Sequence, residues 1–307
     1  MEFPKLSIII VSFNCRELLE ACLRSIYSSD TRPMETIVID NASVDGTREM
    51  LKSWRENIRL VENSVNLGHP RAVDQGMDLA RGEAIMILDA DTEVRRDAIS
   101  LMLAVLRDNP EVSMVSPRVL NPDGSLQETA RNFPTVINGI FGRRSLMARI
   151  FPNNRFIKKY LDRENLDKMI PYRVEFISAA CMLFRRSVLT TVGKWDQGYQ
   201  CYWVDADWCM RFRKKNEKIF CVPQAVIVHH EQNKAFQKKS PKRILNFHLG
   251  ALRLYRIHYT LGYLDPRYIA AAVLLAIRTV VLMIANTFLG IRKSVKVDPL
   301  SIKKSES

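Results

Sequence analysis

The chain has 307 residues, of which 47% are hydrophobic and 26% are charged. This length allows one large domain, or one domain with an appendage, and the composition argues against a disordered chain. The formal net charge of +13 favours an anionic partner: a nucleic acid, a phospholipid surface or a phosphorylated substrate. Charge alone does not choose among these partners.

The six cysteines contain no C-x-x-C pair, which argues against a zinc ribbon. Most of them stand beside apolar residues, so we expect reduced, buried thiols in a reducing compartment. The amino-terminal segment starts with an acidic residue and holds only a short apolar run, which predicts a strand rather than a signal peptide. We therefore expect a cytoplasmic protein.

Strands and helices are predicted to alternate through the first third of the chain. Leu6 to Ser12 is a continuous apolar run of strand length, and Arg16 to Tyr27 has its apolar residues at helical spacing. Similar patterns predict strands at Thr36–Asp40, Ile58–Glu62 and Ala84–Leu88 and helices at Asp45–Glu56 and His69–Arg81. This alternation predicts an α/β protein with a parallel sheet covered by helices on both faces. In such sheets ligands bind outside the carboxyl ends of the strands.

The rest of the chain is predicted to be less regular. We expect helices at Asp97–Asn109 and Asp205–Asn216, a strand at Phe176–Phe184 followed by a helix from Arg186, and a last strand within Lys218–Val228. Residues 130–172 are basic, aromatic and irregular, which is typical of a variable insertion. The composition changes after residue 233, so we divide the chain into an α/β domain, residues 1–233, and a basic, amphipathic helical region, residues 234–307.

Polar residues follow three of the predicted strands. The first strand ends in V-S-F-N (11–14), the second in D-N-A-S-V-D-G-T (40–47) and the fourth in D-A-D (89–91). Carboxylates at Asp89 and Asp91 can converge on Mg²⁺ or Mn²⁺, which would neutralise a diphosphate leaving group. Aspartate after a strand is often only a helix N-cap, but the carboxyl edge of a sheet favours the metal site. Neither a dinucleotide fingerprint nor a P-loop follows the first strand.

These segments resemble those of the inverting family-2 glycosyltransferases with the GT-A fold, and within them a rhamnosyltransferase-like branch. The further matching segments are N-L-G-H-P-R-A-V-D-Q-G (66–76), A-R-G-E (80–83), L-D-A-D-T-E-V (88–94), P-R-V-L-N-P-D-G-S (117–125), F-I-S-A-A-C-M-L-F-R-R (176–186), D-A-D-W-C-M-R (205–211) and V-P-Q-A-V-I-V-H-H (222–230). The resemblance implies a GT-A (Rossmann-like), mostly parallel sheet, with residues 1–233 as the catalytic domain.

The resemblance also implies which residues hold the donor. Ser12, Asn14 and Asp40 match positions that hold the base and ribose of the donor nucleotide. Asn66 and Arg71 match positions near the nucleotide and its phosphates. The implied donor is a nucleoside-diphosphate sugar, linked to dTDP or UDP.

A metal site is implied by three further matches. Asp89 and Asp91 match the D-x-D motif, Asp91 as the more direct metal ligand and Asp89 also beside the donor. His229 resembles a third metal-binding position at the end of the last strand. On its own His229 reads as a capped surface imidazole, and the neighbouring His230 leaves open which of the two points inward. The implied cofactor is Mg²⁺ or Mn²⁺.

The resemblance places the general base at Asp205, which would deprotonate the acceptor hydroxyl. Val204 replaces a glutamate that is common in the family, which puts acceptor binding in doubt more than chemistry. Asp205 and Asp207 also read as helix caps, a role we favour for Asp207. Trp195 and Asp196 match a position that shapes the acceptor pocket, and Asp207 is assigned to the acceptor side with them.

Residues 268–291 form an apolar stretch long enough to span a bilayer, interrupted near its middle by Arg278. A cation there costs roughly 2.5–3.5 kcal/mol, and basic residues flank both ends (Arg267; Arg292, Lys293, Lys296). We expect a helix in the membrane interface, with Arg278 reaching the headgroups and a basic cluster attracting anionic lipid (Lys234, Lys238, Lys239, Lys242, Arg243). The alternative is a solvated charge run beside a helix packed on the domain.

The resemblance thus implies a metal-dependent, inverting hexosyl-type glycosyltransferase of cell-surface polysaccharide synthesis. A rhamnose-like sugar is favoured by the resemblance, with a glycan or polyprenyl-diphosphate-linked acceptor and a peripheral place on the inner face of the cell membrane. The main alternative is a non-catalytic, glycosyltransferase-like protein that binds a membrane or a partner, which only Val204 supports. A nucleic-acid-binding protein is disfavoured because no nucleic-acid module is recognisable.

Overall fold

The computed structural model describes residues 5–32, 35–133, 168–230 and 240–294, with side chains described up to Thr287. The elements are β1 (Leu6–Ser12), α1 (Arg16–Tyr27), β2 (Glu35–Asp40), α2 (Thr47–Lys52), β3 (Arg59–Glu62), α3 (His69–Leu79), β4 (Ala84–Asp89), β5 (Thr92–Val94), α4 (Ala98–Asp108), β6 (Val112–Leu120), β7 (Leu126–Gln127), β8 (Tyr172–Val174), β9 (Cys181–Arg185), α8 (Val188–Thr191), α9 (Val204–Lys214), β10 (Lys218–His229), α10 (Pro241–Tyr259) and α11 (Pro266–Ser294). Most of the predicted insertion lies outside the described residues, as do Lys234, Lys238, Lys239 and Lys296 and the side chains of Arg292 and Lys293.

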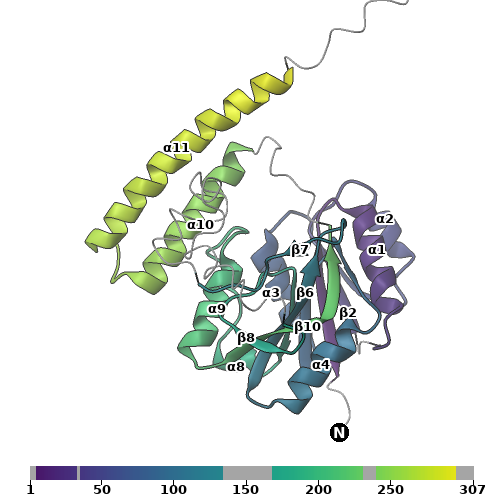
Figure 1. Ribbon diagram of the computed structural model, residues 1–307. Helices are drawn as coiled ribbons and strands as arrows, with labels where there is room; N and C mark the ends of the chain where they lie inside the picture. Colours follow the sequence, from purple (N-terminus) through teal and green to yellow (C-terminus); the bar gives the residue numbers. More distant parts are fainter. Residues whose placement is uncertain (1–4, 33–34, 134–167, 231–239, 295–307) are drawn as a thin grey trace, which may run out of the picture. The chain divides into compact units, whose positions relative to one another are not determined.

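The strands form a mixed, mostly parallel sheet (Figure 1). Its order across the described residues is β3-β2-β1-β4-β9-β6-β10-β5, with β7 paired to β6 and β8 to β10. The run from β3 to β4 is parallel, β6 and β10 are parallel to each other, and β9 runs antiparallel between β4 and β6. Because two reversals restore direction, β6 and β10 point the same way as β4. The predicted mostly parallel α/β fold is confirmed.

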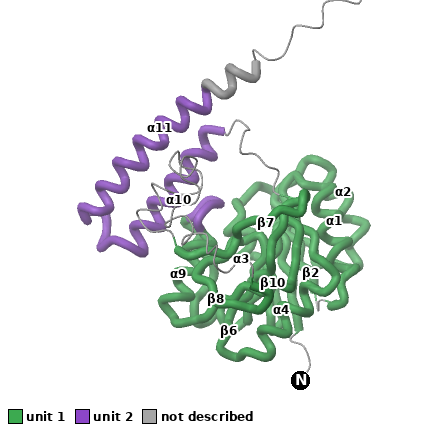
Figure 2. Tube along the Cα trace, in the orientation of Figure 1, with its two compact units in different colours: residues 1–198, 204–231 green, residues 199–203, 232–307 purple. Residues whose placement is uncertain are grey.

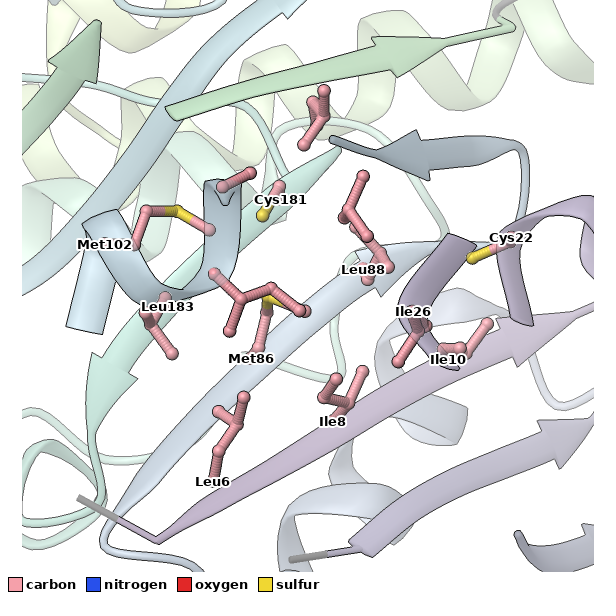
Figure 3. Close-up of a cluster of buried hydrophobic side chains, with 14 of the residues drawn as sticks. Leu6, Ile8, Ile10, Cys22, Ile26, Met86, Leu88, Met102, Cys181 and Leu183 are labelled. Atoms are coloured by element: carbon pink, nitrogen blue, oxygen red, sulfur yellow. The ribbon is translucent and has the colours of Figure 1, made fainter. Parts of the chain in front are cut away.

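Helices cover both faces of this sheet, which explains why its central strands are continuously apolar. On one face, Ile8 and Ile10 of β1 belong to a buried cluster with residues of α1, α4 and β9, such as Met102 (Figure 3). On the other face, Ile9 meets Gly76 of α3, where an added Cβ would lie only 2.3 Å from Ile9 Cγ2. The chain therefore needs a side-chain-free position to bring α3 against β1.

Two predicted elements are shorter in the structure. The helix expected from Asp45 begins at Thr47, because Asp45 Oδ1 accepts hydrogen bonds from the backbone N–H of Thr47 (3.1 Å) and from its hydroxyl (2.5 Å). Gly46 has φ 86, outside the helical region. The strand expected over residues 176–184 begins at Cys181, since Phe176 instead forms an isolated bridge with Arg131.

The chain divides into two compact units, Met1–Gly198 with Val204–Glu231, and Tyr199–Trp203 with Gln232–Ser307 (Figure 2). The second unit takes in the segment Tyr199–Trp203, which the sequence division left with the α/β domain. Trp203 Nε1 donates a hydrogen bond to the carbonyl of Phe247 in α10 (2.9 Å), which explains why that segment groups with the helices. Within this unit α10 packs against α11.

Candidate active site

Two carboxylates and one imidazole converge at the carboxyl edge of the sheet. Asp89 ends β4, Asp91 stands just before β5, and His229 ends β10. The antiparallel pairing of β10 with β5 sets His229 opposite Thr92, which carries the imidazole to the D-A-D turn. His229 Nε2 lies 3.1 Å from Asp91 Oδ1 and 3.8 Å from Asp89 Oδ2, and one ligand atom from each residue falls within a 4.8 Å group.

Gln127 of β7 fixes the orientation of His229. Its Oε1 lies 3.0 Å from His229 Nδ1, and its Nε2 donates to the His229 carbonyl at 2.9 Å. Because Oε1 can only accept, Nδ1 is the donor, and a neutral His229 presents its Nε2 lone pair to the two carboxylates. Three electron-pair donors facing one another suit a hard divalent cation, so the residues present fit Mg²⁺ or Mn²⁺. His230 instead turns to Glu93, with Nε2 2.6 Å from Oε1.

The protonated form of His229, rather than the neutral one, acts on the pKa of Asp91. Burial alone would raise the pKa of Asp91, but a protonated His229 donates a hydrogen bond and adds a positive charge, which together outweigh burial, so this pKa lies below its usual value. The carboxylate is therefore ionised at neutral pH, the form in which it can bind a cation.

His69, at the start of α3, is a site residue for which the sequence suggested no role. Its Nε2 lies 3.6 Å from Asp89 Oδ1, and its ring packs on Trp195 with centroids 5.5 Å apart. Burial lowers the pKa of His69 to about 4 despite the opposing charge of Asp91, so this imidazole is neutral at neutral pH. The Nε1 of Trp195 is buried and has no hydrogen-bond partner among the described residues. The feature of the sequence that could have pointed to His69 is its place directly after N-L-G (66–68).

Residues expected to hold the base and ribose lie together at the ends of β1 and β2. Asn14 adopts a positive φ of 50. Its backbone N–H donates a hydrogen bond to Ser43 Oγ (2.9 Å), and its Oδ1 accepts one from the Val44 N–H (2.8 Å). The Oδ2 of Asp40 accepts hydrogen bonds from the Ser43 N–H (3.1 Å) and from Arg48 Nε (2.8 Å). Ser12 is fully buried beside them. Asp40 Oδ1 is buried and has no hydrogen-bond partner among the described residues.

A second loop carries the residues expected near the phosphates. Asn66 Oδ1 accepts hydrogen bonds from Asn41 Nδ2 (2.9 Å) and from the Gly68 N–H (2.8 Å), so it ties this loop to the end of β2. Arg71 is exposed in the first turn of α3. Neither Asn41 nor Arg48 was singled out from the sequence, although both lie within or beside D-N-A-S-V-D-G-T.

The expected general base, Asp205, is half-buried in the first turn of α9. Burial raises its pKa, against hydrogen bonds from backbone N–H groups, those of Ala206 and Ala179 among them, and the charge of Arg131. The next residue, Ala180, accepts a hydrogen bond from the Asp89 backbone N–H at 3.1 Å. The dipeptide 179–180 thus connects the Asp205 carboxylate to the D-A-D strand end.

The three residues expected on the acceptor side make different contacts. Asp207 is 1% exposed, and its Oδ2 is paired with Arg211 Nε at 2.9 Å. Asp196 Oδ1 accepts a hydrogen bond from the Gly198 N–H at 2.8 Å. Trp195 is 3% exposed and contacts His69, which itself faces Asp89. The structure therefore connects Trp195 to the carboxylate cluster and ties Asp207 into its own helix.

Residues 7–193 match the family described as "Glycosyl transferase family 2", which is more than half of the 307-residue chain. The chain is also similar to the N-acetylglucosaminyl-diphospho-decaprenol L-rhamnosyltransferase of Mycobacterium tuberculosis. The two are 27% identical over 238 residues, covering 74% of this chain and 76% of that protein.

Solved structures share the fold at low sequence identity. The mannosyltransferase PcManGT from Pyrobaculum calidifontis, in complex with GDP-Man and Mn²⁺, matches with a TM-score of 0.58 and 17% identity, covering 97% of this chain and 77% of that one. GalNAc-T7 with UDP, GalNAc and Mn²⁺ matches with a TM-score of 0.61 and 18% identity over 83% of this chain. This chain covers 48% of GalNAc-T7, about half its length.

Proposed function

Because the chain belongs to glycosyl transferase family 2 and transfers sugar from a nucleotide sugar, we propose that it is an inverting, metal-dependent hexosyl transferase. The observation that carries this proposal is the convergence of Asp89, Asp91 and His229 within 4.8 Å at the carboxyl edge of the sheet. These residues would hold Mg²⁺ or Mn²⁺. A divalent cation at that edge would neutralise the diphosphate of the donor as it departs.

In the proposed reaction the acceptor hydroxyl oxygen bonds to the anomeric carbon while the bond from that carbon to the diphosphate breaks. The hydroxyl proton passes to the Asp205 carboxylate. The raised pKa of Asp205, caused first by burial, supports this role because it makes the carboxylate a better proton acceptor. Attack from the face opposite the diphosphate would invert the anomeric carbon.

The donor nucleotide would lie over the ends of β1 and β2, beside Ser12, Asn14 and Asp40. Asn66 and Arg71 would flank its phosphates, and Trp195 and Asp196 would line the acceptor side. We propose a dTDP- or UDP-linked donor with a rhamnose-like sugar and a polyprenyl-diphosphate-linked or glycan acceptor. The likeness to a rhamnosyltransferase named for a decaprenol-linked substrate supports both choices. Such an acceptor would place the enzyme peripherally on the inner face of the cell membrane.

The non-catalytic alternative rests on Val204. Val204 is 1% exposed in the first turn of α9, so packing offers another explanation for its apolar character. This explanation supports the enzyme over the non-catalytic alternative.

Donor hydrolysis and transfer, measured with Mn²⁺ or Mg²⁺ and then with a chelator, test the proposal. We expect metal-dependent turnover in the wild type, and losses of at least about 100-fold in Asp91→Asn and Asp205→Asn. Asp108→Asn is the matched control, because Asp108 is an exposed residue at the end of α4. Chelator-insensitive turnover, or equal activity in all three variants, would contradict the assignment.

A further inference from the structure

Helix α11 is apolar on its exposed side. The segment Pro266–Thr287 is 22 residues long, and its most apolar 18-residue window has a mean hydropathy of 2.3 with only 6% of its residues buried. Every exposed residue between positions 269 and 286 is apolar: Ile269, Ala270, Val273, Leu274, Ala276, Ile277, Val280, Val281, Leu282, Ile284 and Ala285. A water-facing helix normally has the opposite pattern, so this face is built for an apolar partner.

The polar residues of the same stretch lie on the other side of the helix. Thr279 and Asn286 are 9% and 8% exposed, and the Thr279 hydroxyl donates to the Leu275 carbonyl at 2.7 Å. Arg278 is half-buried, and its charge acts on the buried His248 of α10, the helix that packs against α11. Arg278 is therefore half-buried and near enough to α10 for its charge to act there, whereas the sequence suggested that it reaches outward to headgroups.

Length alone would allow α11 to cross a bilayer, since 22 residues of helix extend about 33 Å. The helix that packs against α11, α10, argues against a bilayer-spanning arrangement. Helix α10 packs on α11 and carries Lys242, Arg243, Arg253 and Arg256, which a spanning hairpin would carry into the hydrocarbon. A helix lying parallel to the surface keeps these cations in water.

The charge of the pair favours a lipid surface over a second copy of the chain. In the described part of the helical unit, the acidic residue Asp265 is paired with Arg267 at 2.7 Å. The other charged side chains discussed for α10 and α11 are all basic (Lys242, Arg243, Arg253, Arg256 and Arg278). Two such basic units would repel each other, whereas an anionic leaflet would attract each of them. The turn before α11 adds Leu261, Tyr263 and Leu264, which are 95%, 64% and 90% exposed, and such aromatic and apolar residues suit the headgroup boundary.

We propose that α11 lies in the plane of the membrane with its exposed apolar face among the acyl chains, while α10 stays on the aqueous side. This arrangement deepens the peripheral membrane placement of the proposed function and rests on it. A helix in this position would hold the chain at the leaflet without itself crossing it.

Flotation of the full chain with phosphatidylcholine vesicles containing a minority of phosphatidylglycerol tests whether the exposed apolar face of α11 binds a membrane. Ile277 is 57% exposed on α11, and Ile170 is 67% exposed on the catalytic unit. We expect Ile277→Asp to weaken vesicle binding about tenfold or more, and Ile170→Asp to leave it unchanged. Equal binding of both variants would overturn the proposal, as would a wild type that does not float. A shift of Ile277→Asp from dimer to monomer with unchanged flotation would assign the face to a second copy.

Tags at the two termini test the orientation. In sealed membrane vesicles, an in-plane α11 leaves amino- and carboxyl-terminal tags accessible from the same side, whereas a spanning helix places them on opposite sides and would overturn the proposal. Donor hydrolysis of the same proteins in detergent separates the two ideas. If hydrolysis is retained but the protein does not float, only the membrane proposal is contradicted. If the protein floats but does not hydrolyse the donor, only the proposed sugar transfer is contradicted.

Discussion

At the scale of single residues, the ion pair of Asp207 and Arg211 is expected to stabilise the α/β domain because the Asp207 carboxylate is buried. Asp207 has a side chain 2% exposed, and Arg211 is 24% exposed and also donates to the Val192 carbonyl at 3.0 Å. Arg211→Met leaves a buried carboxylate without its counterion, so we expect a loss of about 3 kcal/mol in the free energy of unfolding. Urea denaturation monitored by circular dichroism measures it.

The control is Arg213→Met, on the same helix. Arg213 is 62% exposed, and its nearest ion pair, with Glu175, is 3.7 Å long. Surface pairs of this kind contribute about 0–1 kcal/mol, so Arg213→Met should change stability by less than about 1 kcal/mol. Equal losses in the two variants would show that the pair of Asp207 and Arg211 is not buried in solution.

The residues of the site that directly follow a strand could be predicted from the sequence better than those that are brought together only by the fold. Asp89 and Asp91 were predictable because their place after a strand fixes their edge of the sheet. The choice between His229 and His230 was not, since it depends on β10 pairing with β5, a three-residue strand too short to recognise. His69 was missed because its role arises from packing on Trp195, far away in the chain.

At the scale of elements, the contact of α3 with β1 depends on Gly76. Alanine in a helix is favoured over glycine by about 1 kcal/mol, so an exposed glycine here would be improved by the change. Yet a Cβ at position 76 would lie 2.3 Å from Cγ2 of the fully buried Ile9. We expect Gly76→Ala to lower the unfolding free energy by about 1–3 kcal/mol, as overpacked cores do. Asp78→Ala, at an exposed position of α3, should stay within about 1 kcal/mol. Stabilisation by Gly76→Ala would mean that α3 packs differently.

The elements that were predicted well are those whose apolar pattern decides their structure. The bounds of β1 and α1 agree with the expectation from sequence, because a strand covered on both faces and an amphipathic helix leave clear periodicities. Strand β6 was missed, since Ser113, Ser116, Pro117 and Arg118 interrupt its apolar run. The antiparallel direction of β9 could not be predicted either, because an antiparallel strand buried on both faces has the same composition as a parallel one.

At the scale of the whole molecule, the net charge of +13 is expected to act through the helical unit. Lys242 is exposed at the start of α10, and a charge near an anionic leaflet contributes about 1 kcal/mol. Reversing this charge in Lys242→Glu therefore costs about 2 kcal/mol and should weaken binding to phosphatidylglycerol-containing vesicles about 30-fold. Binding to pure phosphatidylcholine vesicles should not change, because no surface charge is then present. Lys214→Glu, an exposed position on α9 in the catalytic unit, is the matched control and should bind as the wild type does. Cosedimentation at low and high salt measures all three proteins. If Lys214→Glu weakens binding as much as Lys242→Glu, the attraction belongs to the net charge of the chain rather than to the helices that we place at the membrane.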